Sequence, residues 1–249
     1  MGAKLLRVPT QLADAREQFE VIDHFPWYVD AHQWTKLAAD AGSAVAHEGP
    51  GRSRVKLNTG ATDNNEACLA STDELFKFVG NKPIIGEWRI EFAEAATDDA
   101  NIAVGFADAA GANLITDNGG GITATDAILI YKVDGGTKWK VHTEINTLAN
   151  KAGDGSSGAS DALVQSNTTA GGSSAQVLRI EALPRSSTVF EVRFFVDGVL
   201  LKDSNGVAIM HAVALGTATD MDMVAGYVKA GGATDEILYV DYAYGGQAI

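Results

Sequence analysis

The chain has 249 residues, 46% of them hydrophobic and 20% charged, a composition that excludes a wholly disordered protein. The net charge of −13 argues against nucleic acid or an anionic membrane as a direct partner, because both repel an acidic surface. The single cysteine, Cys68, excludes an intrachain disulfide, and we expect it to be a small buried hydrophobe. A chain of this length can fold without a metal, and we expect no cofactor.

Residues 1–20 differ from the rest and predict an N-terminal arm, followed by one β-sandwich domain over residues 21–249. The segment 9–19 fits a short helix with Thr10 as its N-cap, and it fits an extended arm equally well. The first residues include Lys4 and Arg7 but no apolar run of the length that a signal peptide requires. We therefore expect a protein that is made in the cytoplasm and either stays there or leaves by assembly and lysis.

Period-two alternation of apolar and polar residues dominates the chain after the arm and predicts strands. In residues 87–92, charged side chains alternate with Trp88, Ile90 and Phe92. Further strands are predicted at 102–106 and 127–133, and at 138–143 after an Asp-Gly-Gly turn. Residues 108–125 and 150–174 are rich in Gly, Ala, Asn and Ser, and we expect two long loops that bury no core.

The second half of the chain contains the best-defined local motif. A strand is predicted at 177–182, and in residues 190–197 four apolar side chains fall on one face. Asp197-Gly198 then predicts a two-residue hairpin turn, and residues 199–202 return as the next strand. Strands at 223–228 and 237–244 complete a pattern of short strands and frequent turns. This pattern predicts an all-β fold, a two-sheet antiparallel jelly-roll sandwich.

Candidate catalytic residues are few. A glycosidase needs two carboxyl groups about 5–5.5 Å or about 6.5–9.5 Å apart, depending on its mechanism. Glu87 and Glu91 share a strand face, but Arg89 stands between them, so we expect a solvated strand face instead of a catalytic pair. The five histidines show no spacing typical of metal ligands. We therefore expect no catalytic residue and no metal site.

Two further groups of residues have two readings each. Asp63, Asn64, Asn65 and Glu66 supply several oxygens, which suits either a calcium ion or an Asx turn, and the turn is the favoured reading. Phe25, Trp27, Tyr28 and Trp34 form an aromatic segment that either contacts a partner or packs in the core or at a sheet edge. Ordinary aromatic burial favours packing.

Three stretches resemble known proteins. Residues 194–200 resemble the "F-Y-V-D-G-x-x" hairpin of concanavalin A-like lectin and glucanase jelly rolls, and residues 236–244 resemble their final strand. Residues 59–66, together with 105–108, resemble uncharacterised proteins encoded among tailed-phage structural genes. The glucanase branch carries a Glu-x-Asp-x-Glu strand, which Arg89 interrupts here, so the resemblance implies a protein that is not an enzyme.

The phage resemblance implies a head decoration (cement) protein. Such a protein would bind the lattice of the major capsid protein on the capsid exterior, as a homo-oligomer, after synthesis in the host cytoplasm. The acidic surface could match basic patches on a capsid. Two alternatives stay open: a carbohydrate-binding, lectin-like module on a virion or cell surface, and a glycoside hydrolase of the jelly-roll class with Glu87 and Glu91 as an unorthodox acid pair.

Overall fold

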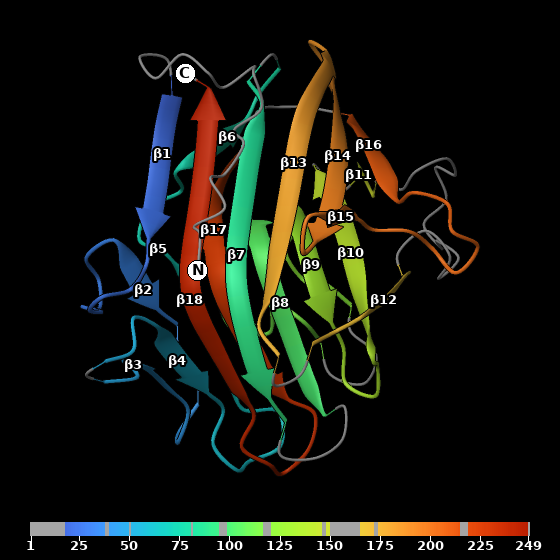
Figure 1. The fold of residues 1–249 in the computed structure, drawn as a ribbon. Helices are drawn as coiled ribbons and strands as arrows, with labels where there is room; N and C mark the ends of the chain where they lie inside the picture. The colour runs from blue at the N-terminus through green and yellow to red at the C-terminus, as the bar shows by residue number, and fades with distance from the viewer. Residues whose placement is uncertain are drawn as a thin grey trace.

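The computed structural model describes residues 18–37, 40–49, 51–80, 82–94, 99–116, 121–145, 148–149, 165–171, 174–214 and 219–248. These residues form two antiparallel sheets that pack face to face, sheet A in front of sheet B in Figure 1. None of them lies in a helix, so the described part of the chain contains no helix that could cross a membrane. The predicted all-β, two-sheet sandwich is confirmed.

Sheet A has the strand order β15-β14-β13-β7-β18-β4-β3, with β1 also paired to β18 and β16 to β14. Its central strands are the long ones, and β18 is bordered by β7 on one side and by β1 and β4 on the other. The bounds are β1 (Gln18–Asp23), β3 (Ala44–His47), β4 (Val55–Asn58), β7 (Ile84–Ala93), β13 (Gln176–Ser186), β14 (Val189–Val196), β15 (Val199–Leu200), β16 (Met210–Ala214) and β18 (Ile237–Ala248).

Sheet B has the order β11-β10-β9-β8-β17-β5-β2, with β12 paired to β10 and β6 to β17. The bounds are β2 (Trp34–Lys36), β5 (Glu66–Ser71), β6 (Phe76–Phe78), β8 (Ala100–Ala107), β9 (Ala127–Lys132), β10 (Lys138–Ile145), β11 (Leu148–Ala149), β12 (Gln165–Thr169) and β17 (Thr219–Ala230). The strand β1 belongs to sheet A and β2 to sheet B, so the segment between them crosses from one sheet to the other.

The predicted arm falls mostly on residues 1–17, which lie outside the described residues. Its last three residues form the start of β1, which pairs with the end of β18 from Gln18 opposite Ala248. The domain boundary after residue 20, and the choice between a helix and an extended arm, therefore stay predictions.

The predicted hairpin at residues 190–202 is confirmed. β14 alternates strictly between buried and partly buried residues, with Phe190 and Phe194 on the buried face. Asp197 and Gly198 have φ angles of 51° and 78°, the positive values that a type I′ turn requires at both positions. The returning strand β15 pairs Val199 with Val196, as the alternation predicts.

The core lies between the sheets and is rich in aromatic contacts. Phe106 of sheet B packs against Trp88 of sheet A with ring centroids 5.6 Å apart, and against Phe76 and Phe78 at 5.0 and 5.8 Å. All three contacts are edge-to-face, an arrangement that adds to the energy of area burial. The inward direction predicted for the Trp88 face of residues 87–92 is confirmed.

The prediction of two long loops that bury no core is wrong in part. Leu114 and Ile115 are fully buried and form a second apolar cluster on the outer face of sheet B with Tyr227, so residues 108–125 do bury a core. A few apolar residues suffice here because sheet B itself supplies the rest of the cluster. In the segment 150–174, residues Gln165–Thr169 form β12 on the edge of sheet B, while residues 150–164 lie outside the described residues.

We predict that Phe106→Ala lowers the free energy of unfolding by about 3–5 kcal/mol, because it leaves a cavity where both sheets meet. Val199→Ala, a truncation at an exposed residue of β15, is the matched control and is expected to change it by less than about 0.5 kcal/mol. Chemical denaturation of both variants measures the difference. Equal effects would show that the aromatic contacts do not hold the sheets together.

Candidate functional site

The outer face of sheet A carries the charged side chains of β7, whose residues 87–91 have acids at the first and last positions of the Glu-x-Asp-x-Glu pattern. Because Trp88, Ile90 and Phe92 point into the core, Glu87, Arg89 and Glu91 of β7 point outward. The two glutamates therefore share one face, as predicted.

Both glutamates are held by neighbours on adjacent strands. Tyr242 Oη of β18 donates to Glu87 Oε1 at 2.5 Å, and Arg179 Nη1 of β13 lies 3.6 Å from Glu87 Oε2. These contacts bury Glu87, so the expectation of a solvated strand face is wrong at this residue. Burial, followed by the Glu87 carboxylate, raises the pKa of Tyr242, which keeps the phenol protonated as the donor.

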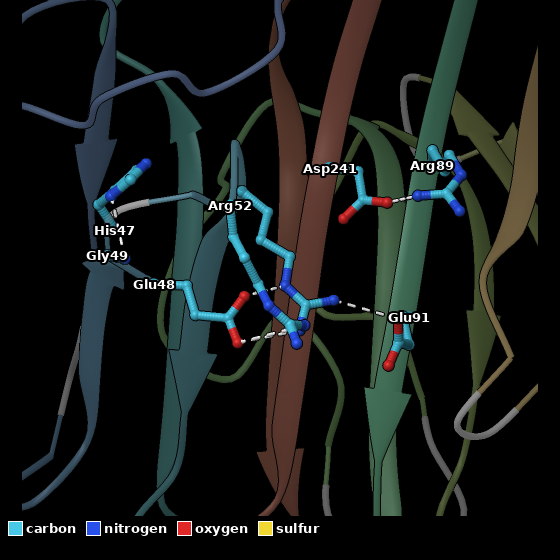
Figure 2. A network of polar contacts seen from close by, with 8 residues as sticks. His47, Glu48, Gly49, Arg52, Arg89, Glu91 and Asp241 are labelled. Atoms are coloured by element: carbon cyan, nitrogen blue, oxygen red, sulfur yellow. Dashed lines mark hydrogen bonds and ion pairs between the residues drawn. The ribbon is translucent and has the colours of Figure 1, made fainter.

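A second group of charges lies beside β7, as Figure 2 shows. Arg54 Nη1 donates to Glu91 Oε2 at 3.1 Å, and the same guanidinium pairs with Glu48. The guanidinium carbon of Arg54 also lies 3.8 Å from the centre of the Tyr239 ring, a cation–π contact. The pKa of the Glu48 carboxyl is lowered, chiefly by its hydrogen bonds from Arg54.

Arg89 occupies the position where the glucanase strand has its middle acid. Its guanidinium pairs with Asp241 on the neighbouring strand β18 (Figure 2). A cation with its own carboxylate partner thus separates Glu87 from Glu91. The face is a network of ion pairs across β18, β7, β13 and the segment between β3 and β4, and it differs from the acid-acid-acid row of a hydrolase.

The polar cluster at residues 63–66 has the geometry of a turn. Asn64 has a φ of 65°, and Asn65 donates its backbone N–H to Thr62 O at 3.2 Å and its side-chain amide to Ala41 O at 3.1 Å. Glu66 points the other way, into the protein, so the four side chains do not converge on one point. Within the described ranges, no group of three or more His, Cys, Asp or Glu residues could hold a metal ion.

The aromatic segment divides into buried and exposed members. Phe25 and Trp34 are buried with ring centroids 5.7 Å apart, so these two residues pack in the protein, as expected, and do not form a contact surface. Asp23 fixes them, because its carboxylate accepts from the backbone N–H of Phe25 at 2.6 Å and from Trp34 Nε1 at 2.9 Å. Phe25 has a φ of 45°, a strained value for a residue with a side chain.

Trp27 lies at the surface and Tyr28 is partly buried against the core, and both line a pocket of about 330 Å³ that the segment between β1 and β2 forms. Trp27 is 72% exposed, and Ile22 and Val29 are exposed beside it on the same pocket. Tyr28 Oη donates to Asp30 Oδ1 at 3.0 Å, and burial, followed by that bond, raises the pKa of the phenol. Ile22, near the end of β1, and Val29, in the segment that follows, were not singled out from the sequence, because no periodicity marks an exposed apolar residue at a strand end or in a loop.

An acidic cluster at one end of β17 was also not predicted. Ser71 Oγ lies 3.4 Å from Asp222 Oδ1 and accepts the backbone N–H of Met223 at 2.9 Å. Burial and the nearby carboxylate of Glu74, followed by those of Asp73 and Asp108, raise the pKa of Asp222 to about 6. Its members come from three separate loops or strands, so no sequence spacing reveals the cluster.

The sequence matches no protein-family profile and no curated protein. Its structure is similar to the carbohydrate recognition domain of Emp47p, with a TM-score of 0.58, 12% identity, and coverage of 95% of this chain and 100% of that domain. It is also similar to an endo-1,3-β-glucanase from Streptomyces sioyaensis, with a TM-score of 0.57, 13% identity, and coverage of 95% and 98%. Peanut lectin has a TM-score of 0.52 at 9% identity, over 93% of this chain and 98% of that lectin.

The chain has the concanavalin A-like jelly-roll fold. The fold resemblance of the hairpin at residues 194–200 and of the closing strand is thereby confirmed. At these identities the likeness concerns the fold alone, since one jelly-roll scaffold carries many functions. The candidate sites of this jelly roll are therefore judged on its own residues.

We predict that Asp222 makes stability depend on pH. Folding raises the pKa of this acid above its ordinary value of about 3.9, so the stabilisation is complete below that value and is lost as the pH rises through about 6. Asp222→Asn removes this titration. Between pH about 5 and about 7.5, the wild type is expected to lose about 1–2 kcal/mol relative to the variant, a value that allows for solvent screening. Denaturant titrations at both pH values test this, and parallel curves for the two proteins would contradict it.

Proposed function

We propose that this protein is a non-enzymatic virion structural protein, a decoration (cement) protein that binds the major capsid protein lattice of a phage head. The observation that carries the proposal is an exposed apolar surface in a very acidic protein. Three of the six large hydrophobic side chains that are exposed in the described residues, Ile22, Trp27 and Val29, lie on the pocket between β1 and β2. We call this surface the Trp27 patch.

The Trp27 patch has the properties of a protein contact. Tryptophan is enriched among the few residues that dominate binding energy, and such residues lie at the centre of an interface beside a pocket. The Asp23 hydrogen bonds to Phe25 and Trp34 hold the segment in one conformation, in which Phe25 and Ala31 keep the unfavourable φ angles of 45° and 60°. A contact surface that is rigid before binding loses little entropy on docking.

Three other features support a structural role. The glutamates of β7 are engaged in ion pairs and hydrogen bonds, so neither Glu87 nor Glu91 is a free acid. The net charge of −13 suits a partner with basic patches. The stretches 59–66 and 105–108 resemble uncharacterised proteins encoded among tailed-phage structural genes, and the choice of a capsid partner rests on this resemblance. Such proteins work on the capsid exterior, and closed symmetry favours a homo-oligomer.

The test is co-sedimentation of the purified protein with phage heads assembled without it. We expect saturable binding of the wild type and at least about tenfold weaker binding of Trp27→Ala, the effect of losing a central aromatic contact. Val207→Ala is the matched control, because Val207 is 62% exposed, as Val29 is, but does not line the pocket. No co-sedimentation of the wild type, or equal binding of Trp27→Ala, would overturn the proposal.

Carbohydrate binding is the second candidate function, and the shape of the Trp27 patch favours it. The pocket has aromatic rings beside the polar side chains of His32 and Gln33, and none of its lining residues is a lysine or an arginine. The only carboxylate in the pocket lining is that of Asp23, and it already accepts two hydrogen bonds from the protein. A neutral sugar ring that stacks on Trp27 and bonds to the polar rim fits this lining.

For this second function we expect neutral polysaccharides to quench the fluorescence of Trp27 on binding, with no need for calcium. Trp27→Ala should abolish binding and Val207→Ala should preserve it. Isothermal titration with the same glycans provides an independent measurement. A glycan array on which the wild type binds nothing would remove this candidate without affecting the capsid proposal.

A further inference from the structure

Lys229 of β17 is buried without a carboxylate partner. Its side chain is part of a residue that is 2% exposed, and its Nζ donates to Asn113 Oδ1 at 3.0 Å and approaches Ile115 O at 3.4 Å. No carboxylate oxygen of the described residues lies within 4.0 Å of this nitrogen. A buried charge without a counter-ion is costly, so the arrangement requires an explanation.

The second buried lysine of sheet B provides the contrast. Lys132 of β9 is 1% exposed, and its Nζ lies 2.7 Å from Glu94 Oε1 and 3.0 Å from Ala100 O. This is an ordinary buried ion pair, in which the carboxylate compensates the charge. Lys229 instead has the neutral side-chain amide of Asn113 as its partner, where Lys132 has the carboxylate of Glu94.

A carboxylate is present next to this amide, but it serves Asn113 and a tyrosine. Glu66 of β5 lies directly opposite Lys229 in the β5–β17 ladder and is itself 3% exposed. Its two oxygens accept the backbone N–H of Asn113 at 2.8 and 2.7 Å, and Oε2 accepts Tyr227 Oη at 2.6 Å. Burial, followed by the Glu66 carboxylate, raises the pKa of Tyr227, so the phenol remains a donor.

These contacts place the buried amine of Lys229 and the buried carboxylate of Glu66 against Asn113, an exposed residue of the segment that covers them. The carboxylate fixes the backbone of Asn113, whose φ of 57° lies in the left-handed region that asparagine adopts more readily than most residues with a side chain. Leu114, Ile115 and Tyr227 surround the cluster with apolar surface, where a neutral product is favoured over an ammonium ion. The Lys229 Nζ lies 3.0 Å from Asn113 Oδ1, the oxygen bonded to the Cγ that it would attack, so the two reacting side chains are already in contact.

We propose that Lys229 and Asn113 form an intramolecular isopeptide bond. The Lys229 ammonium first gives one proton to the Glu66 carboxylate. The free amine Nζ then attacks Cγ of Asn113, a C–N amide bond forms, and the second proton that Nζ loses moves to the departing nitrogen as the bond from Cγ to Nδ2 breaks. Ammonia leaves and takes the first proton back from Glu66 as ammonium, so the positive charge of the lysine leaves the protein with it.

Two features of the loop suit this reaction. Asn113 lies at the exposed end of the cluster, so ammonia has a path to solvent while Lys229 stays buried. The new bond would join the 108–116 segment covalently to β17, across 116 positions of the sequence. The inference is independent of the proposed function, because it concerns the outer face of sheet B and not the Trp27 patch.

Intact mass spectrometry of the purified wild-type protein tests the proposal directly. We expect a mass below that of the sequence by one ammonia molecule, and a protease digest that yields one joined peptide containing residues 113 and 229. Lys229→Arg and Asn113→Ala should each show the full mass of their sequence. A wild-type mass equal to that of the sequence would overturn the proposal, whether or not either variant folds.

Ammonia loss has a second chemical source, cyclisation of an asparagine to a succinimide, and the digest separates the two. A succinimide leaves the peptides of residues 113 and 229 unjoined and persists in Lys229→Arg, and this result would also overturn the proposal. Glu66→Gln tests the role of the carboxylate: we expect most of that variant to remain unlinked after purification and the joined peptide to increase slowly with time.

Discussion

The contact between Phe106 and Trp88 determines which side chains of the two central strands point into the core and which point to the outer faces. It joins the middle of sheet B to the middle of sheet A, and it fixes which face of β7 and β8 points inward. Because side chains alternate along a strand, the inward position of Trp88 forces Glu87 and Arg89 outward. A shift of register by one residue would put these charges between the sheets, so the aromatic core also specifies the polar exterior.

The outer faces of sheets A and B, which the core between the sheets does not cover, are stabilised by different contacts. The outer face of sheet A satisfies its charges internally, through pairs such as Arg89 with Asp241 and Arg179 with Glu181. The outer face of sheet B is covered by the segment around Leu114, which builds a second apolar cluster over Tyr227. Half of the large hydrophobic side chains that are exposed in the described residues then lie where the chain crosses between the sheets, and this crossing forms the Trp27 patch.

The sequence was sufficient for the parts of the fold that depend on local pattern. Alternation in residues 190–197 and the Asp197-Gly198 turn predicted a hairpin that the structure contains, because strand faces and turn angles are set by near neighbours. It was insufficient for the polar contacts. Tyr242 and Glu87 are 155 positions apart, and Lys229 and Asn113 are 116 apart, so only the sheet order brings them together. The burial of Glu87 was missed for the same reason.

The position of β18 has a consequence for how the chain can fold during synthesis. This strand pairs with β7 on one side and with β1 and β4 on the other, yet it is made after all of them. Until it leaves the ribosome, β1 and one edge of β7 lack their partner, and their backbone groups stay open to other strands. Sheet A therefore closes late, through contacts that are distant in sequence, which is a feature of slowly folding all-β proteins.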